Sequence, residues 1–365
     1  MSDIQFNIEQ PDYPEIEDAA SEENDSIYYS VSSFGADYTV DGLVKRLEKK
    51  QIVVPDFQRK YVWDIKKASR FIESLIIGLP VPGIFLSRDI LDNNDTHQSQ
   101  GHLIIDGQQR LLTLQKFYKG FFGEKKFRLL GVCDELCGKS YDELSLDDQA
   151  RLDDAIIHAT IIRQDTPSKD HSSIYMVFER LNTGGMLLQP QEIRACIYHG
   201  EFNNLLNVLI KQPNWRVLLK NESTRMKEQE MLLRFFALYF KHNEYKKGLK
   251  HFLNSFMSDN QNLQVYDKEC LTNLFTNTIN LIVQAKGSEA FRRGAAVNAA
   301  IFDSVMIGVA QRLQLSEMSS EECRIKYDGL MHNQRFIDCT TNSTADEKQL
   351  KERIRLSIEA FATKE

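Results

Sequence analysis

Five consecutive residues, Asp106-Gly107-Gln108-Gln109-Arg110, have the side-chain types that phosphate chemistry needs. An arginine makes bidentate, charge-assisted hydrogen bonds to phosphate oxygens. A carboxylate can hold Mg²⁺ or accept a proton from water. A glutamine can orient an attacking water, as in some GTPases. The run is therefore a candidate nucleotide-phosphate site, in which Asp106 and Gln109 are the catalytic candidates and Asp106 is also the candidate metal ligand.

A strand, a glycine turn and a helix must position these side chains. Leu103 to Ile105 have the length and branching of a buried strand, which Asp106-Gly107 interrupts. From Gln108 onward the apolar residues fall at helical spacing, and Gly120 supplies a stop. The free N–H groups and the positive dipole end of such a helix favour an anion. Gly107, Gln108 and Arg110 are therefore expected to bind phosphate, although a simple turn with a helix cap has the same local pattern.

Two other loops carry polar residues that suit a ligand. In the first, Gln58 and Arg59 stand between Phe57 and the aromatic residues that follow, so the loop is either packed or part of a site. In the second, Arg180 and Asn182 precede paired glycines, for which an interhelical turn is the default interpretation.

The charge of the chain is unevenly distributed. Its formal net charge is −7 over 365 residues, and residues 1–31 hold nine Asp and Glu but no Lys or Arg. The remainder is close to neutral and does not indicate strong nonspecific DNA binding. We interpret residues 1–31 as an acidic flexible tail. Alternatively, this tail shields a basic groove until a partner or nucleic acid displaces it.

The pattern of elements predicts an α+β fold, with a mixed-sheet N-terminal domain over residues 32–200 and an all-α region over 201–365. Thr39 or Asp41 should cap a first helix, and Asp64 should cap a second. Strands are expected at 52–54, 84–86, 102–105 and 159–163, and helical periodicity at 142–158. After residue 200 the expected helices are 203–212, 228–242, 246–257, 269–286, 296–314 and 346–363.

Several classes of protein are not indicated. The six cysteines are scattered, as is usual for reduced cytosolic thiols, and we expect a cytoplasmic protein. No apolar run approaches membrane-spanning length, so no membrane association is expected. No Gly-x-x-x-x-Gly-Lys-Ser/Thr motif is present, so the chain is not a P-loop enzyme.

Taken together, the motifs resemble a known family. The set comprises Val54-Pro55-Asp56-Phe57-Gln58-Arg59-Lys60-Tyr61-Val62-Trp63, Ile72-Glu73-Ser74-Leu75, Gly78-Leu79-Pro80-Val81-Pro82, Ile105-Asp106-Gly107-Gln108-Gln109-Arg110-Leu111, Arg180-Leu181-Asn182-Thr183-Gly184-Gly185 and Glu192-Ile193-Arg194. It resembles the N-terminal domain of GmrSD-type restriction endonucleases, which belongs to the ParB/sulfiredoxin-like group of folds. The resemblance covers about residues 36–215.

The resemblance implies a bacterial antiviral defence protein that binds, and often hydrolyses, nucleoside triphosphates with Mg²⁺. Such domains sense modified DNA or regulate a nuclease. The DGQQR segment is the family's nucleotide motif, here Asp106 to Arg110. Gln58 and Arg59 should face it from a neighbouring loop, or touch DNA modifications instead, and Arg180 and Asn182 should approach from the third loop.

One departure from the family concerns the nuclease. Two-part members carry a His/Asn/His nuclease site after this domain, and residues 200–365 show no such constellation. We therefore expect a sensor or regulatory subunit of a modification-dependent restriction system, acting with a separate nuclease, and no DNA cleavage by this chain alone. Two alternatives stay open: a DNA-binding module without turnover, and a partner or neutraliser of a separately encoded nuclease. Which nucleotide binds, whether it is hydrolysed and whether the chain forms homo-oligomers are also open.

Overall fold

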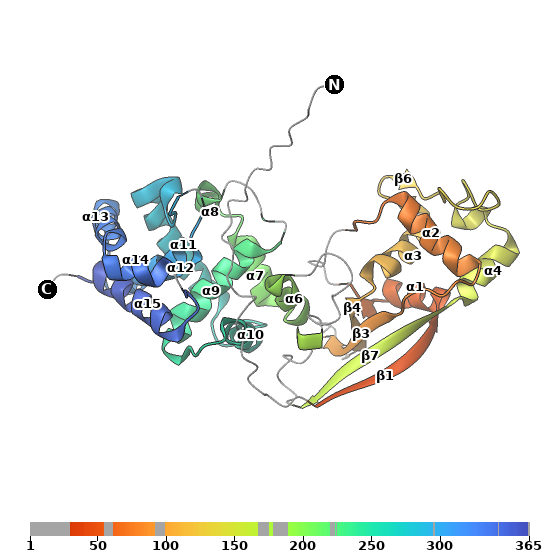
Figure 1. The fold of residues 1–365 in the computed structure, drawn as a ribbon, viewed down its shortest axis with the longest axis horizontal. Coiled ribbons are helices and arrows are strands. Elements are labelled where there is room, and N and C mark those ends of the chain that lie inside the picture. Colours follow the sequence, from red (N-terminus) through yellow and green to blue (C-terminus); the bar gives the residue numbers. More distant parts are fainter. Residues whose placement is uncertain are drawn as a thin grey trace, which may run out of the picture. The chain divides into compact units, whose positions relative to one another are not determined.

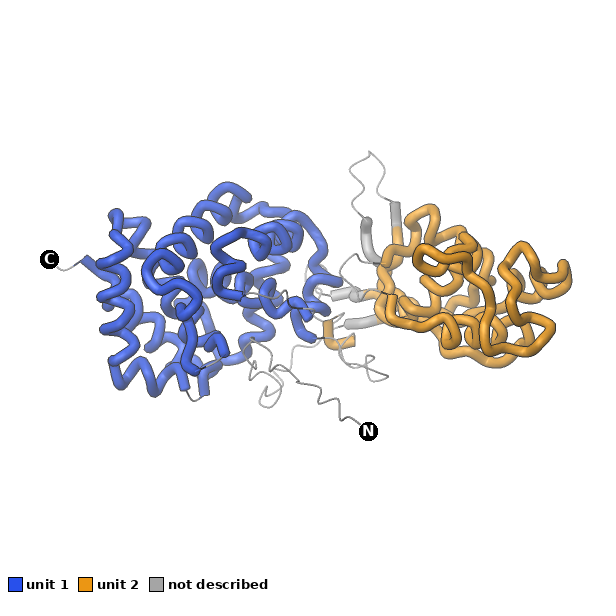
Figure 2. The backbone as a smooth tube through the Cα atoms, turned by 90° about the horizontal axis from the view of Figure 1, so that it is seen from above, with its two compact units in different colours: residues 1–26, 189–365 blue, residues 27–188 orange. Residues whose placement is uncertain are grey.

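The chain has two compact units, which are described separately. The computed structural model describes residues 30–54, 61–91, 99–166, 175–177, 189–219, 223, 225–294, 296–341 and 343–363. Contacts group residues 27–188 into an N-terminal unit and residues 189–365 into a helical unit (Figure 2). The boundary expected from sequence fell after residue 200. The contacts place it one helix earlier, before α6 (Pro190–Ile197).

The N-terminal unit is built on a mixed five-stranded sheet, with strand order β1-β7-β3-β4-β2. Its strands are β1 (Ser30–Thr39), β2 (Ile52–Val53), β3 (Ile84–Leu91), β4 (Ser99–Asp106) and β7 (Ile156–Thr166). β3 pairs antiparallel with β4 and parallel with β7, while β2 runs parallel to β4. This sheet and the helical second unit confirm the predicted α+β class.

Helices cover one face of this sheet (Figure 1). They are α1 (Val40–Glu48), α2 (Ile65–Ile76), α3 (Gln108–Lys119) and α4 (Leu146–Asp154). Both predicted caps form, because the side chains of Thr39 and Asp64 accept the backbone N–H groups of Gly42 and Lys67. A hairpin of β5 (Phe121–Phe122) and β6 (Lys125–Lys126) and a short helix η1 (Tyr141–Glu143) complete the unit.

Two parts of the sheet differ from the sequence expectation. β1 was not predicted, because it is a polar edge strand. Among its described side chains, Ala36 and Tyr38 pack against the core. The helical segment expected at 142–158 was predicted to end too late in the sequence. α4 stops at Asp154, and the chain enters β7 at Ile156, where pairing with β1 overrides the local pattern.

The helical unit follows the predicted helices and adds three short ones. In chain order its elements after α6 are α7 (Glu201–Leu209), α8 (Pro213–Leu218), α9 (Lys227–Lys241), η2 (His242–Glu244), α10 (Leu249–Asp259), α11 (Lys268–Lys286), η3 (Gly287–Glu289), α12 (Ala299–Leu315), α13 (Ser320–Met331), α14 (Gln334–Thr341) and α15 (Glu347–Phe361). The sequence analysis missed α8, α13 and α14. α12 is buried along most of its length and packs against α9, α11 and α15.

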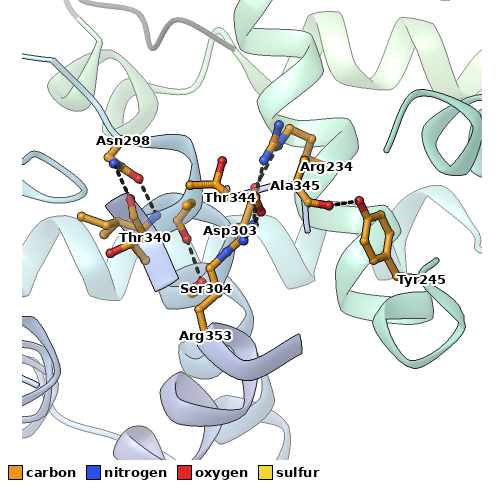
Figure 3. Close-up of polar contacts among 11 residues, drawn as sticks. Arg234, Tyr245, Asn298, Asp303, Ser304, Thr340, Thr344, Ala345 and Arg353 are labelled. Carbon is orange, nitrogen blue, oxygen red and sulfur yellow. Dashed lines mark hydrogen bonds and ion pairs between the residues drawn. The ribbon is translucent and has the colours of Figure 1, made fainter. Parts of the chain in front are cut away.

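A buried ionic cluster joins three helices of this unit (Figure 3). The carboxylate of Asp303 on α12 accepts hydrogen bonds from Arg234 Nη2 on α9 at 2.6 Å and from Arg353 Nη2 on α15 at 3.3 Å. The Asp303 and Arg353 side chains are 0% exposed. Burial, followed by the nearby Arg234 charge, lowers the pKa of Arg353 to about 10 although Asp303 raises it. One buried carboxylate therefore bridges two buried guanidinium groups.

The turn before α15 is held by the same region. Arg353 Nη1 donates to the carbonyl of Thr344, and the Tyr245 hydroxyl donates to the carbonyl of Ala345 at 2.8 Å (Figure 3). α15 also lies close to α12 at Gly308, where an added Cβ would be 2.4 Å from Ser357 Oγ. Among the described residues, no helix has the length and apolar character needed to cross a membrane.

Candidate nucleotide-phosphate site

The predicted strand–glycine–helix arrangement is confirmed. Asp106 is the last residue of β4, and Gln108 is the first of α3. Gly107 lies between them with φ 102°, a left-handed conformation that side-chain-bearing residues rarely adopt. A Cβ added to Gly107 would be 2.4 Å from Ile84 Cγ2, so the backbone here lies directly against β3. The turn therefore requires glycine for both its conformation and its packing.

Gly107→Ala is expected to destabilise the N-terminal unit by about 2–5 kcal/mol, since left-handed strain and overpacking add. Gly120→Ala is the matched control, because Gly120 also has a positive φ, 78°, but nothing lies within 4 Å of its added Cβ. It should cost about 1–2 kcal/mol. The chain has two tryptophans, one in each unit, so Trp63 in a Trp215→Phe background reports unfolding of this unit. Equal costs for the two variants would contradict the close packing against Ile84.

Gly107, the N-cap residue of α3, has no side chain and therefore makes no side-chain capping hydrogen bond. The first backbone hydrogen bond of the helix runs from the Leu111 N–H to the Gly107 carbonyl at 3.0 Å. The amides of the three preceding residues are therefore outside the helical ladder. Gln108, the first of the two predicted amides, stands at this end with an intermediate exposure. Such a helix end suits an anion.

The side chain of Arg110 is fixed at this helix end. Its Nη2 donates to Asp106 Oδ2 and to the carbonyl of Gly83, each at 2.8 Å. Its side chain is 15% exposed, whereas that of Asp106 is 48% exposed. Arg110 Nε is buried and has no hydrogen-bond partner among the described residues. The guanidinium is thus held in place by two contacts and has a donor left over, while the carboxylate beside it is open to solvent.

Gln109 connects α3 to the loop before α2. Its Oε1 accepts the Val62 N–H at 2.9 Å and the Trp63 N–H at 3.4 Å. A second link joins the Tyr61 hydroxyl to Thr113 Oγ1 at 2.8 Å. Burial raises the pKa of Tyr61, so this hydroxyl stays protonated. Gln109 Oε1 therefore holds the loop before α2 in position. Its Nε2 is buried and has no hydrogen-bond partner within the described ranges.

The structure brings together only part of the predicted site. Asp106, Gly107, Gln108, Gln109 and Arg110 meet at the start of α3. The remaining predicted residues, Gln58, Arg59, Arg180 and Asn182, lie outside the described residues. The sequence analysis did not single out Gly83 or Thr113, because a carbonyl acceptor and a helix-face threonine acquire their roles through contacts far along the chain.

The last segment of the motif set has a structural role in the helical unit. Gln189 and Glu192 form the capping box of α6, and Glu192 pairs with Arg225 at 2.9 Å. Arg194 is 1% exposed and donates to Asn254 at 2.8 Å. Its guanidinium also pairs with Glu230 at 3.3 Å. These contacts anchor α6 in the helical unit.

The helix end offers Asp106 as a candidate metal ligand. Among the described residues, no three His, Cys, Asp or Glu side chains gather in a way that could hold a metal. Mg²⁺, however, is commonly held by one or two carboxylates together with waters and substrate phosphates. A single half-exposed carboxylate, Asp106, fits that mode of binding and does not fit an all-protein metal site.

Comparison with known proteins identifies the domain. Residues 41–199 match the family described as GmrSD restriction endonuclease, N-terminal domain. This match confirms the resemblance drawn from the motifs. A comparison of the chain with curated proteins gave no match.

Proposed function

We propose that the N-terminal unit binds the phosphates of a nucleoside triphosphate at the start of α3, in a component of a restriction system. One observation carries the proposal. Arg110 is fixed beside a helix N-terminus whose N-cap residue is a glycine, and its Nε has no hydrogen-bond partner among the described residues. A guanidinium, backbone amides and a positive helix end together favour a phosphate group.

The carboxylate of Asp106 explains why a divalent cation belongs to this proposal. Asp106 pairs with Arg110 at 2.8 Å. A phosphate that approached Arg110 would therefore also approach the Asp106 carboxylate. Like charges at such distances repel, so a divalent cation between the two groups makes phosphate binding more favourable. Asp106 would hold Mg²⁺, and the ion would neutralise phosphate charge.

Hydrolysis is the finer part of the proposal. Asp106 would accept a proton from water, and the half-exposed position of its side chain at the helix end supports this role. Gln109 is the second candidate from the sequence. Its Oε1 already accepts two backbone N–H groups, so its contribution to catalysis would come from positioning the loop before α2.

The family supports the wider role. A GmrSD-type N-terminal domain in this chain supports a sensor or regulatory subunit of a restriction system that acts with a separate nuclease in the cytoplasm. In this proposal, nucleotide binding regulates the restriction system and does not drive DNA cleavage by this chain.

A thermal-shift panel of ATP, GTP, CTP and UTP with Mg²⁺ tests this proposal. At 100 times its Kd a ligand adds about 2.7 kcal/mol to the stability of the state that binds it. At least one triphosphate should therefore raise the Tm of the N-terminal unit by roughly 5–10 °C. Arg110→Ala should abolish the shift, whereas Gln115→Ala on the same helix should retain it. No shift with any of the four would contradict the proposal, and release of phosphate in the same samples tests hydrolysis.

A further inference from the structure

Lysine side chains lie over aromatic rings at two places on the N-terminal unit. Lys67 Nζ lies 5.1 Å above the ring of Trp63, and Lys116 Nζ lies 5.0 Å above the ring of Tyr61. The rings of Tyr61 and Phe122 meet edge to face, with centroids 5.4 Å apart. We call these five residues, which come from α2, α3, β5 and the loop before α2, the lysine–aromatic surface.

Cations outnumber acidic groups among the described residues of the elements that carry this surface. The same helices and hairpin carry six cations that form no ion pair with a described carboxylate, namely Lys66, Lys67, Arg70, Lys116, Lys119 and Lys125. The acidic groups on these elements are fewer. Asp64 caps α2, Glu73 accepts the Cys133 N–H at 2.7 Å, and Glu124 lies in the turn between β5 and β6. The surface therefore suits a polyanion that also has apolar groups for the rings.

The chain itself contains a segment with that chemistry. Residues 1–29 hold nine carboxylates and no Lys or Arg, interleaved with apolar side chains such as Ile4, Phe6, Tyr13 and Ile16. The segment joins the unit at Ser30, where β1 begins. Because 29 residues can span up to roughly 100 Å, the segment has ample reach. Tethering also gives it an effective concentration in the millimolar range.

We propose that residues 1–29 bind the lysine–aromatic surface and compete there with other polyanions. The inference goes beyond the proposed nucleotide site, since none of the surface residues is a predicted phosphate ligand. Opposite charge and shared apolar character favour this occupant. A nucleic acid backbone could use the same lysines, and the test treats it as the competitor.

The test compares the full chain with a variant in which all nine acidic residues of the segment are changed to Asn or Gln. A fluorescent DNA duplex of 20 base pairs serves as the competing polyanion. Neutralising the segment should raise the affinity for the duplex by about tenfold or more at low salt, since the lysines become available. Adding Lys67→Gln and Lys116→Gln to this variant should remove the gain in duplex affinity. Lys49→Gln and Lys50→Gln, which change exposed lysines after α1, are the control and should preserve the gain.

A second measurement does not depend on DNA. A synthetic peptide of residues 1–29, added to the neutralised variant with Trp215→Phe, should change the Trp63 emission saturably and more weakly as salt rises. Equal duplex affinity with and without the nine charges would overturn the proposal. So would a peptide that fails to bind, or one that binds the Lys67→Gln/Lys116→Gln variant equally well.

Discussion

Asp303→Ala is expected to destabilise the helical unit by about 3–5 kcal/mol, because it leaves two buried guanidinium groups without their shared carboxylate. Arg234 and Arg353 come from α9 and α15, so the loss acts on the contacts of α12 with these two helices. Denaturant unfolding read from Trp215 in a Trp63→Phe background measures the cost. Trp215 is fully buried in this unit, so its emission reports the loss of the core.

Arg355→Ala is the matched control for this prediction. It removes an ion-paired arginine from the same helix, but its partners Glu352 and Glu359 lie at the surface and the Arg355 side chain is 53% exposed. Exposed ion pairs contribute little to stability, so the unfolding midpoint of this variant should be close to that of the parent. Replacing Arg234, Asp303 and Arg353 together by Met, Leu and Met should cost less than Asp303→Ala alone, since the three charges of the cluster are removed together. Equal midpoints for Asp303→Ala and Arg355→Ala would contradict this account of the cluster.

Asp106→Asn is expected to make phosphate binding independent of Mg²⁺. The carboxylate repels the phosphate unless a cation intervenes, whereas an amide still accepts from Arg110 and carries no charge. Without Mg²⁺ the variant should bind a triphosphate roughly tenfold or more tightly than the parent, and adding Mg²⁺ should improve its binding little. Thermal shifts in EDTA and in excess Mg²⁺ measure both effects.

Asp134→Asn, which neutralises a carboxylate in an exposed turn, is the control and should keep the metal dependence of the parent. If Asp106→Asn instead abolishes binding under both conditions, Asp106 serves as an obligatory structural partner of Arg110, and the electrostatic explanation is wrong.

The local part of the candidate site could be predicted from the sequence. A branched apolar strand, a glycine and a periodic helix with a glycine stop are all encoded within residues 103–120, and each was found where expected. The caps at Thr39 and Asp64 were predicted for the same reason, since a cap depends on residues within one turn.

The contacts that give the site its shape could not be predicted in this way. Gln109 meets Val62 across 47 positions, and Arg110 meets the Gly83 carbonyl across 27. Such pairs depend on the register of β3 and β4 and on the packing of α2 against α3. For the same reason β1 was missed, because its few apolar residues give a weak pattern and its pairing with β7 spans over a hundred residues.

One residue of the sequence indicates the ionic cluster of the helical unit. Asp303 is the only acidic residue of α12, between Phe302 and Val305 in a mostly apolar helix, and a lone buried acid requires a partner. Its partners lie 69 and 50 positions away, so the sequence could indicate that a partner exists but could not name Arg234 or Arg353.

The most direct test of the phosphate site is a titration of the stabilising triphosphate, with Mg²⁺, into the Trp215→Phe chain while the emission of Trp63 is followed. Trp63 adjoins the backbone groups that Gln109 holds at the first turn of α3. We predict a saturable change that Arg110→Ala eliminates and Gln115→Ala preserves. Binding of equal affinity to the parent and to Arg110→Ala would show that the nucleotide does not use this helix end and would contradict the account.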